Sequence, residues 1–489
     1  MYKSIIDAVL EHGRNRPEKL ALADNERAIT YKELVQHLTA IAGILRNLDI
    51  HKGDNLLVEC TQDARFIAID LACELSHIVF IPIEKKMSED RVKSIYEHIN
   101  AKALIAKTDY AEIENCHHID DIWDKISLAE TNAEYDQKTI EYDIAEILFT
   151  TGTTGIPKGI VISHRANVAI AENIKYGVEM KENAIELVPL PLSHSHGLRT
   201  CYAHLLNGST TVIIDGIMNV GLFFDMIEKY GVNAIDISPT LAKILLKIGM
   251  RGLEKYKDKI DYIEIGSAVL EEETKKMLKK IFMKSRLYNF YGSTEAGRCC
   301  VCNFNEINNE GCIGRPSINA EMLIVDDSKK EIHSSKEKLG LLAIRGSMIM
   351  NEYYNNRKLT EETLINDIIY TNDLGYIDES GKVYIVGRND DIINYKGIKI
   401  APEEIESVAT LPHYIKDCAC VPIKDNICGQ VPMLYVSICD SSFDINLYIE
   451  YLRENLEQTR VPKRIEVVEQ IPRSENGKLL RKRLMTDAK

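Results

Sequence analysis

The chain has 489 residues, which exceeds one ordinary hydrophobic core and predicts several domains. Its composition, 45% hydrophobic and 27% charged, is typical of a globular protein rather than a disordered or fibrous one. The formal net charge of −14 argues against a nucleic-acid partner, because such proteins normally present a basic surface. No apolar run is long enough for a membrane span, and residues 1–20 lack a continuous apolar signal core, so we expect a cytoplasmic protein.

From the N-terminus, segments with helical and strand patterns alternate. Apolar residues recur at helical spacing in residues 31–48 and 91–99, whereas residues 77–83 form an apolar run typical of a buried strand. The mostly apolar residues 144–149 predict another buried strand, which leads directly into a loop of unusual composition.

This loop reads FTTGTTGIPKG at residues 149–159 and combines hydroxyl groups, glycines and a lysine. Hydroxyls donate hydrogen bonds, glycines let the backbone fold around an anion, and a lysine adds positive charge. We therefore predict a phosphate-binding loop; the alternative is a flexible polar loop between strands. The spacing disfavours a Walker-type ATPase, because Lys158 follows Gly155 by three residues and precedes Gly159. The candidate ligands are Thr150, Thr151, Gly152, Thr153, Thr154 and Lys158.

Beyond the loop the alternation continues, with strand patterns at residues 211–215, 234–237 and 262–265 and helical patterns at 221–230 and 241–248. Such repetition predicts an α/β fold with doubly wound parallel sheets and ligands at the strand ends. Residues 311–387 change to short alternating strands, which predict a smaller β-rich subdomain. A new α+β unit follows the polar turn at residues 388–391.

The later motifs resemble, in the same order, those of the AMP-forming adenylating superfamily, which includes acyl-CoA synthetases, aryl-acid ligases and stand-alone adenylation domains. They are GSAVL at residues 266–270, NFYGSTE at 289–295, GRP at 314–316, TNDLG at 371–375, GRNDDIINYKG at 387–397 and PRSENGK at 472–478. The resemblance implies an N-terminal adenylation domain over residues 1–388, a hinge over 389–391 with Asp390 as its pivot, and a mobile C-terminal α+β domain over 392–489.

The resemblance also implies an acid–thiol ligase. A carboxylic acid is joined to the α-phosphate of ATP with release of pyrophosphate, and the pantetheine thiol of CoA then displaces AMP. One alternative is a stand-alone adenylation enzyme that loads an acyl or aryl group onto a carrier protein. A second is a non-catalytic nucleotide-binding homologue, against which the presence of Lys478, Thr294 and Glu295 argues.

Roles for single residues follow from the same resemblance. Lys478 would bridge carboxylate and phosphate oxygens, Thr294 would contact the α-phosphate, and Glu295 would help to hold Mg²⁺, which prefers oxygen ligands. In the nucleoside site, Asp373 would bind the ribose hydroxyls, and Arg388 would contact ribose or phosphate. The implied adenine contacts are Gly266, Ser267, Ala268, Tyr291 and, to the exocyclic amine, Asn289; Gly292 would belong to the same nucleotide site.

The segment VPLPLSHSHGLR at residues 188–199 matches the family's PLxHxxG with His194 in register, and His196 offers a competing register. His194, Ser195 and Ser238 would line the acyl pocket; a buried core histidine is the alternative for His194. Ser195 stands where amino-acid-activating members carry an acidic residue, which disfavours an α-amino acid substrate. Gly397 would border the pantetheine tunnel. Arg298 departs from the small residues usual in the family; of the two alternatives, a contact with the acyl pocket or exposure, we expect it to face solvent.

Overall fold

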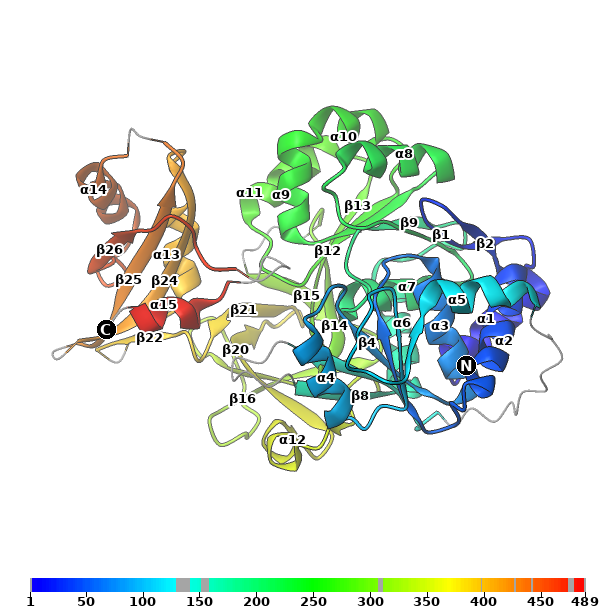
Figure 1. The fold of residues 1–489 in the computed structure, drawn as a ribbon. Helices are drawn as coiled ribbons and strands as arrows, with labels where there is room; N and C mark the ends of the chain where they lie inside the picture. Colours follow the sequence, from blue (N-terminus) through cyan, green and yellow to red (C-terminus); the bar gives the residue numbers. More distant parts are fainter. Residues whose placement is uncertain are drawn as a thin grey trace.

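The computed structural model describes residues 2–128, 141–150, 158–306, 311–396, 398–425, 428–440, 443–473 and 479–487, and these residues fold around three β-sheets. Two of the sheets belong to a large body, and the third lies in a smaller lobe at the left of Figure 1. The fold class predicted from the alternating pattern is confirmed. The domain boundaries at residues 388 and 392 stay a prediction.

The first sheet runs through the whole of the large body. It contains β1 (Leu20–Ala23), β2 (Ala28–Thr30), β9 (Ile185–Val188), β10 (Thr210–Ile213), β11 (Ala234–Ile237), β12 (Tyr262–Ile265), β13 (Arg286–Ser293), β14 (Gly297–Asn303), β15 (Cys312–Pro316), β16 (Ala320–Val325), β17 (Gly340–Gly346), β19 (Leu364–Ile365), β20 (Ile368–Ile377) and β21 (Val383–Arg388). Their order is β16-β17-β20-β21-β15-β14-β13-β12-β11-β9-β10-β1-β2, and β19 pairs with β20. Because β15 pairs with both β14 and β21, the β-rich segment continues this sheet.

The second sheet has the order β18-β8-β7-β4-β3-β5-β6. Its strands are β3 (Asn55–Glu59), β4 (Val79–Ile83), β5 (Ala103–Ala106), β6 (Cys116–His118), β7 (Ile144–Thr150), β8 (Lys158–Ser163) and β18 (Glu352–Tyr353). Strand β7 confirms the strand predicted before the phosphate loop. Thr150 and Lys158 are paired across β7 and β8, so the two ends of the candidate loop lie side by side.

Helices form layers on both faces of these sheets (Figure 1). The described helices of the large body are α1 (Ile5–Asn15), α2 (Tyr31–Asn47), α3 (Ala64–Ser76), α4 (Glu89–His98), α5 (Ile119–Asp124), α6 (His164–Gly177), α7 (Ser195–Asn207), α8 (Val220–Tyr230), α9 (Pro239–Ile248), α10 (Met250–Tyr256), α11 (Glu272–Ile281) and α12 (Arg357–Thr363), with a 3₁₀ turn at Lys125–Leu128. Helices α1, α2, α3, α6 and α7 share one core with both sheets, whereas α8 to α11 cover the other face of the first sheet. None of the helices within the described ranges has the length and apolar character needed to cross a bilayer.

The smaller lobe is built on the third sheet, ordered β23-β22-β25-β24 with β26 beside β25. These strands are β22 (Ile393–Tyr395), β23 (Ile398–Ile400), β24 (Ile415–Asp425), β25 (Gly429–Ile438) and β26 (Arg464–Val467), and the helices are α13 (Pro402–Ala409), α14 (Ile445–Asn455) and α15 (Arg481–Asp487). The lobe has a separate core in which α13 and α14 pack on β24 and β25.

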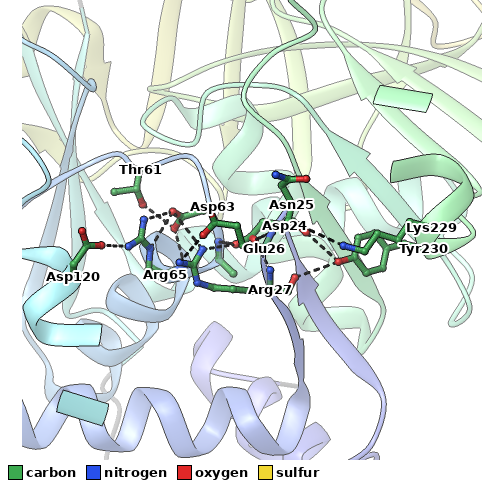
Figure 2. A network of polar contacts seen from close by, with 11 residues as sticks. Asp24, Asn25, Glu26, Arg27, Thr61, Asp63, Arg65, Asp120, Lys229 and Tyr230 are labelled. Carbon is green, nitrogen blue, oxygen red and sulfur yellow. Dashed lines mark hydrogen bonds and ion pairs between the residues drawn. The ribbon is translucent and has the colours of Figure 1, made fainter. Parts of the chain in front are cut away.

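A polar network fastens the outer ends of both large sheets to each other (Figure 2). The Asp24 carboxylate, in the β1–β2 turn, accepts the backbone N–H of Ala64 at the start of α3, with a distance of 3.0 Å. Arg65 pairs with Asp63 at 2.6 Å and also contacts Asp120 on α5. The Tyr230 hydroxyl on α8 donates to the Asp24 carbonyl at 3.0 Å. The network therefore fixes the relative position of the sheets at the edge far from the small lobe.

Candidate active site

Most of the proposed site residues that the structure describes lie at the carboxyl edge of the first sheet. Strand β11 ends just before Ser238, β12 ends just before Gly266, and β13 carries Asn289 and Tyr291 near its end. These strands are parallel neighbours, so their ends meet at one edge. In open α/β sheets this is the edge where ligands bind.

Three residues of the predicted nucleoside site come together. Asp373 and Arg388 are paired across β20 and β21, and the Arg388 Nε lies 3.8 Å from an Asp373 carboxylate oxygen. The Tyr291 hydroxyl donates to the other carboxylate oxygen of Asp373. Burial and then the negative charge of Asp373 raise the pKa of Tyr291 well above its ordinary value, so the phenol stays a donor at neutral pH.

Asn289 carries a buried acceptor that no described residue satisfies. Its side-chain oxygen, Oδ1, receives no hydrogen bond within the described part of the chain. Leaving a buried acceptor unpaired costs about 1–3 kcal/mol, so this oxygen suits a donor brought by a ligand. The exocyclic amine of adenine is such a donor, and the role of Asn289 in binding it stays a prediction.

The loop of Gly266, Ser267 and Ala268 follows β12 in a strained turn. Ser267 has φ of +75°, a left-handed conformation that is uncommon for residues other than glycine. A Cβ on Gly266 would lie only 2.1 Å from the Phe290 ring, so a larger residue would have to displace that ring. Phe290 thus packs directly beneath the loop, between Asn289 and Tyr291 in sequence.

Glu295 lies in the turn after β13, close to one end of the phosphate loop. The Tyr353 hydroxyl on β18 donates to Glu295 Oε1 at 2.9 Å, and the Met350 N–H donates to the Glu295 carbonyl at 2.7 Å. The Lys158 ammonium lies 5.7 Å from the centre of the Tyr353 ring. Tyr353 therefore joins the predicted metal ligand to the predicted phosphate lysine.

The donor set around Glu295 fits Mg²⁺. The Glu295 carboxylate is the predicted ligand and presents oxygen, as this hard cation prefers, while the neighbouring Thr294 is predicted to contact the α-phosphate. No group of three or more His, Cys, Asp or Glu side chains that could hold a metal occurs among the residues that the structure describes. A magnesium ion bound through one carboxylate and substrate phosphates needs no such cage.

The two histidines of the PLxHxxG segment have different surroundings. His194 precedes α7, and its Nε2 lies 3.7 Å from Glu84 Oε1. His196 is hydrogen-bonded through Nδ1 to Ser267 and through Nε2 to Asp236, each at 2.7 Å. The structure therefore links the competing histidine, His196, to the loop at the nucleoside site.

The other two residues predicted for the acyl pocket both lie at helix starts. Ser195 is the first residue of α7. Ser238 caps α9, and its hydroxyl oxygen accepts the Leu241 N–H at 3.3 Å. The assignment of these serines and of His194 to the acyl pocket stays a prediction.

The expectation that Arg298 faces solvent is wrong. Arg298 is 4% exposed, its guanidinium contacts the buried Glu264 carboxylate, and it lies 3.5 Å from the centre of the Phe290 ring. The carboxylate compensates the buried charge, and the aromatic face packs against the flat guanidinium. The partner lies in a different strand, which local sequence does not reveal.

Six predicted site residues lie outside the described residues: Thr151, Gly152, Thr153, Thr154, Gly397 and Lys478. Gly292 is described, and a Cβ there would lie 2.2 Å from the Gly297 carbonyl, which explains the glycine through backbone packing. The predicted pivot Asp390 accepts a hydrogen bond from the Asn372 side chain at 3.1 Å.

Sequence reasoning missed Tyr353 and Asp236. Tyr353 is one of two adjacent tyrosines in a segment without a motif, and only the pairing of β18 with β8 brings it to Lys158. Asp236 interrupts the apolar strand β11, and this charged residue in a buried run was an available signal.

The fold is that of an α/β protein whose predicted nucleotide site lies at the carboxyl edge of its main sheet. Family models describe residues 9–354 as an AMP-binding enzyme and residues 404–478 as the C-terminal domain of such an enzyme. The chain belongs to this family, the AMP-forming adenylating superfamily.

Curated relatives agree with this membership, and solved structures show the same fold. The chain is 26% identical to 4-coumarate–CoA ligase 3 of Arabidopsis thaliana, covering 95% of this chain and 87% of the relative. It is 27% identical to 2-succinylbenzoate–CoA ligase of Staphylococcus epidermidis, covering 98% and 97%. Its fold resembles ATP-bound MatB of Rhodopseudomonas palustris, with a TM-score of 0.90, 20% identity and coverage of 100% and 99%. The o-succinylbenzoate CoA synthetase MenE of Bacillus subtilis gives a TM-score of 0.87, 22% identity and coverage of 98% and 97%.

Proposed function

We propose that the protein is an ATP-dependent acid–thiol ligase that activates a carboxylic acid as its acyl-adenylate and transfers the acyl group to the thiol of CoA. The observation that carries the proposal is the convergence at one sheet edge. Asn289, with its unpaired oxygen, and Tyr291 lie on β13, and Glu295 lies in the turn after it. Tyr291 also contacts Asp373 on β20 of the same sheet. The relatives named as CoA ligases support CoA as acceptor.

In the first step, a carboxylate oxygen attacks the α-phosphorus of ATP, and the bond to pyrophosphate breaks. The reacting groups are both anionic, so cations and hydrogen-bond donors must offset their repulsion and stabilise the transition state. We assign Lys158 to the departing phosphates and Lys478 to the carboxylate and α-phosphate. Magnesium held by Glu295 would supply further positive charge at the phosphates.

In the second step, the thiolate sulfur of CoA attacks the acyl carbon, and AMP leaves with the electrons of the broken acyl–phosphate bond. We assign Gly397 to the wall of the tunnel that admits the pantetheine arm, because a residue without a side chain lets that arm pass closely. The C-terminal lobe would rotate about Asp390 between the two steps, and such motions often limit turnover.

The two alternative functions predict different experimental results. A carrier protein carries the same pantetheine arm as CoA, so an enzyme that loads a carrier protein would share the first step and differ only in its acceptor. A non-catalytic nucleotide-binding homologue would bind AMP without exchanging pyrophosphate. The described geometry of Glu295, Tyr353 and Lys158 favours an enzyme.

The test is pyrophosphate exchange with a panel of uncharged aryl and aliphatic acids, followed by AMP release with and without CoA. We expect exchange with at least one acid and a rise in AMP release when CoA is added. Exchange without any CoA effect would point to a carrier protein. Binding of AMP with no exchange across the panel would contradict the proposal.

A further inference from the structure

Helix α7 presents polar side chains toward the first sheet at four-residue spacing. His196, Thr200 and His204 lie at positions i, i+4 and i+8, which share one face of a helix. The sheet presents three fully buried carboxylates to the same region. They are Glu186 on β9, Asp236 on β11 and Glu264 on β12. Buried carboxylates require polar partners, and each of these has one.

Two of the carboxylates bind a histidine in the same way. His196 Nε2 lies 2.7 Å from Asp236 Oδ1, and the Thr200 hydroxyl donates to the other oxygen of Asp236 at 2.6 Å. His204 Nε2 lies 2.6 Å from Glu186 Oε2. Glu264 is paired with Arg298.

Each of these histidines also contacts a serine through its second nitrogen. His196 Nδ1 lies 2.7 Å from the Ser267 hydroxyl, and His204 Nδ1 lies 2.7 Å from the Ser209 hydroxyl. Ser209 is fully buried, whereas Ser267 is exposed in the loop after β12. The two chains of contacts have the same chemistry, but only the His196 chain reaches the surface of the site.

The His196 chain joins the segments that form the site. His196 follows Ser195, Asp236 precedes Ser238 by two residues, and Ser267 lies between Gly266 and Ala268. Its serine also has the strained φ of +75°, a conformation that persists only where surrounding contacts hold it. The contact between the Ser267 hydroxyl and His196 holds this turn in place.

We infer that His196 is a positioning residue that holds the Ser267 turn in the shape that binds the nucleotide. Carboxylate oxygens accept hydrogen bonds, so the geometry suits an Nε2–H of His196 that donates to Asp236 and an Nδ1 that accepts from the Ser267 hydroxyl. The loop that faces adenine is thereby tied through one imidazole to the buried sheet. This inference rests on the proposed function of that loop.

The experiment uses two substitutions of His196 that separate its two contacts. Asparagine places its amide near the Nδ1 position and keeps the contact with Ser267, whereas glutamine reaches toward Asp236 and loses it. We expect His196→Gln to weaken AMP binding and raise KM for ATP about fivefold, the effect of one lost hydrogen bond, with a smaller change in kcat. His196→Asn should stay within about twofold of the wild type in both values, although it leaves Asp236 with one partner fewer.

Alanine variants of the two serines change less of the structure than the His196 variants and can be compared directly with each other. Ser267→Ala should reproduce the weaker AMP binding of His196→Gln. Ser209→Ala removes the equivalent contact of His204 away from the site, so its AMP affinity and KM for ATP should equal those of the wild type. AMP affinity is measured by calorimetry on the full chain and KM by pyrophosphate exchange, with thermal unfolding recorded for every variant.

The outcomes separate this inference from the proposed function. If the wild type binds AMP and exchanges pyrophosphate, but Ser267→Ala equals Ser209→Ala, then His196 has only a structural role and the inference is overturned. Equal AMP affinity of the asparagine and glutamine variants would overturn it as well. A wild type that neither binds AMP nor exchanges pyrophosphate would overturn both proposals.

Discussion

The Arg298–Glu264 pair places two opposite charges in the interior of the large body, where removal of one partner has a high cost. Glu264 is fully buried, and burial raises the pKa of its carboxyl while the Arg298 charge opposes that rise. A second oxygen of Glu264 has no hydrogen-bond partner among the described residues. Arg298 therefore supplies the main compensation for this carboxylate.

We predict that Arg298→Met lowers the free energy of unfolding by about 3–5 kcal/mol, because it leaves the Glu264 carboxylate buried without a counter-charge. Replacing Glu264 by leucine in the same chain should restore most of the loss. The control is Arg345→Met, whose pair with Glu321 is 51% exposed on both sides and should cost at most about 1 kcal/mol. Denaturant unfolding gives the free energy of unfolding of all three variants. Equal losses for Arg298→Met and Arg345→Met would contradict the prediction.

Lys478 is expected to act in one of the two reactions only. We predict that Lys478→Ala slows adenylate formation by about two to three orders of magnitude, because a charge aimed at the transition state is lost. Thioester formation from a supplied acyl-adenylate should be spared. The two half-reactions are measured separately, and equal losses in both would argue against a role in adenylation alone.

Ser195 bears on the class of acid. A serine carries no charge to hold an ammonium group, and a buried unpaired cation costs several kcal/mol. We predict that an aryl-substituted propionic acid is a better substrate than its α-amino derivative in pyrophosphate exchange. A preference for the amino member of such pairs would move the chain to the amino-acid-activating branch.

Single residues also mark the limit of sequence reasoning. The FTTGTTGIPKG and NFYGSTE segments stand out as motifs because their residues are adjacent in the chain, and their roles stay predictions. Arg298 was misplaced because its partner Glu264 lies in another strand, and because its guanidinium packs against the Phe290 ring. Long-range contacts of this kind have no local signature.

At the scale of elements, local signals predicted helices well and their ends less well. Helix α2 starts where predicted because Thr30 and Glu33 form a reciprocal capping box. The strand predicted over residues 77–83 begins two residues later, as β4, because His77 adopts a left-handed φ of +56° and caps α3. The pairing of β15 with β21 could not be predicted, since it depends on register between distant segments.

Helix α6 begins with His164, which ties it to two other helices. The His164 Nδ1 lies 3.1 Å from Glu74 Oε1 on α3, and the same oxygen accepts the Ile5 N–H of α1 at 2.9 Å. Burial alone would lower the pKa of His164, but the hydrogen bond and the charge of Glu74 outweigh it and raise the pKa. The His164 ring therefore binds its proton more tightly in the folded protein than in the unfolded chain.

We predict that this contact stabilises the fold in weakly acidic solution and fades as the pH rises. A raised histidine pKa contributes stability that is fully present below the unfolded value of about 6.5 and is lost as the pH passes the folded value. The unfolding free energy of the wild type should exceed that of His164→Gln by more at pH 6 than at pH 8.5. A difference that is constant with pH, or larger at high pH, would show that folding does not raise the pKa of His164.

At the scale of the whole molecule, two adjacent residues are held by opposite bodies. Asp390 accepts from Asn372 of the large body at 3.1 Å, whereas Asp391 pairs with Arg481 of the small lobe at 3.2 Å. Arg481 also contacts Glu403 and Glu406 of α13, so it fastens Asp391 to the lobe. A rotation of the lobe would therefore be concentrated at the backbone next to Asp390.

We predict that Asp390→Pro keeps adenylate formation and blocks transfer to the thiol. Proline fixes φ near −65°, which would prevent the swing, and no described residue accepts a hydrogen bond from the Asp390 N–H that proline removes. Asp390→Ala is the matched control, because it loses the Asn372 contact but keeps rotation about φ. Pyrophosphate exchange should stay near the wild-type rate in both variants. CoA-dependent turnover should fall at least tenfold in the proline variant alone, because the second step requires the motion of the lobe. Normal turnover with CoA in Asp390→Pro would show that the pivot lies elsewhere.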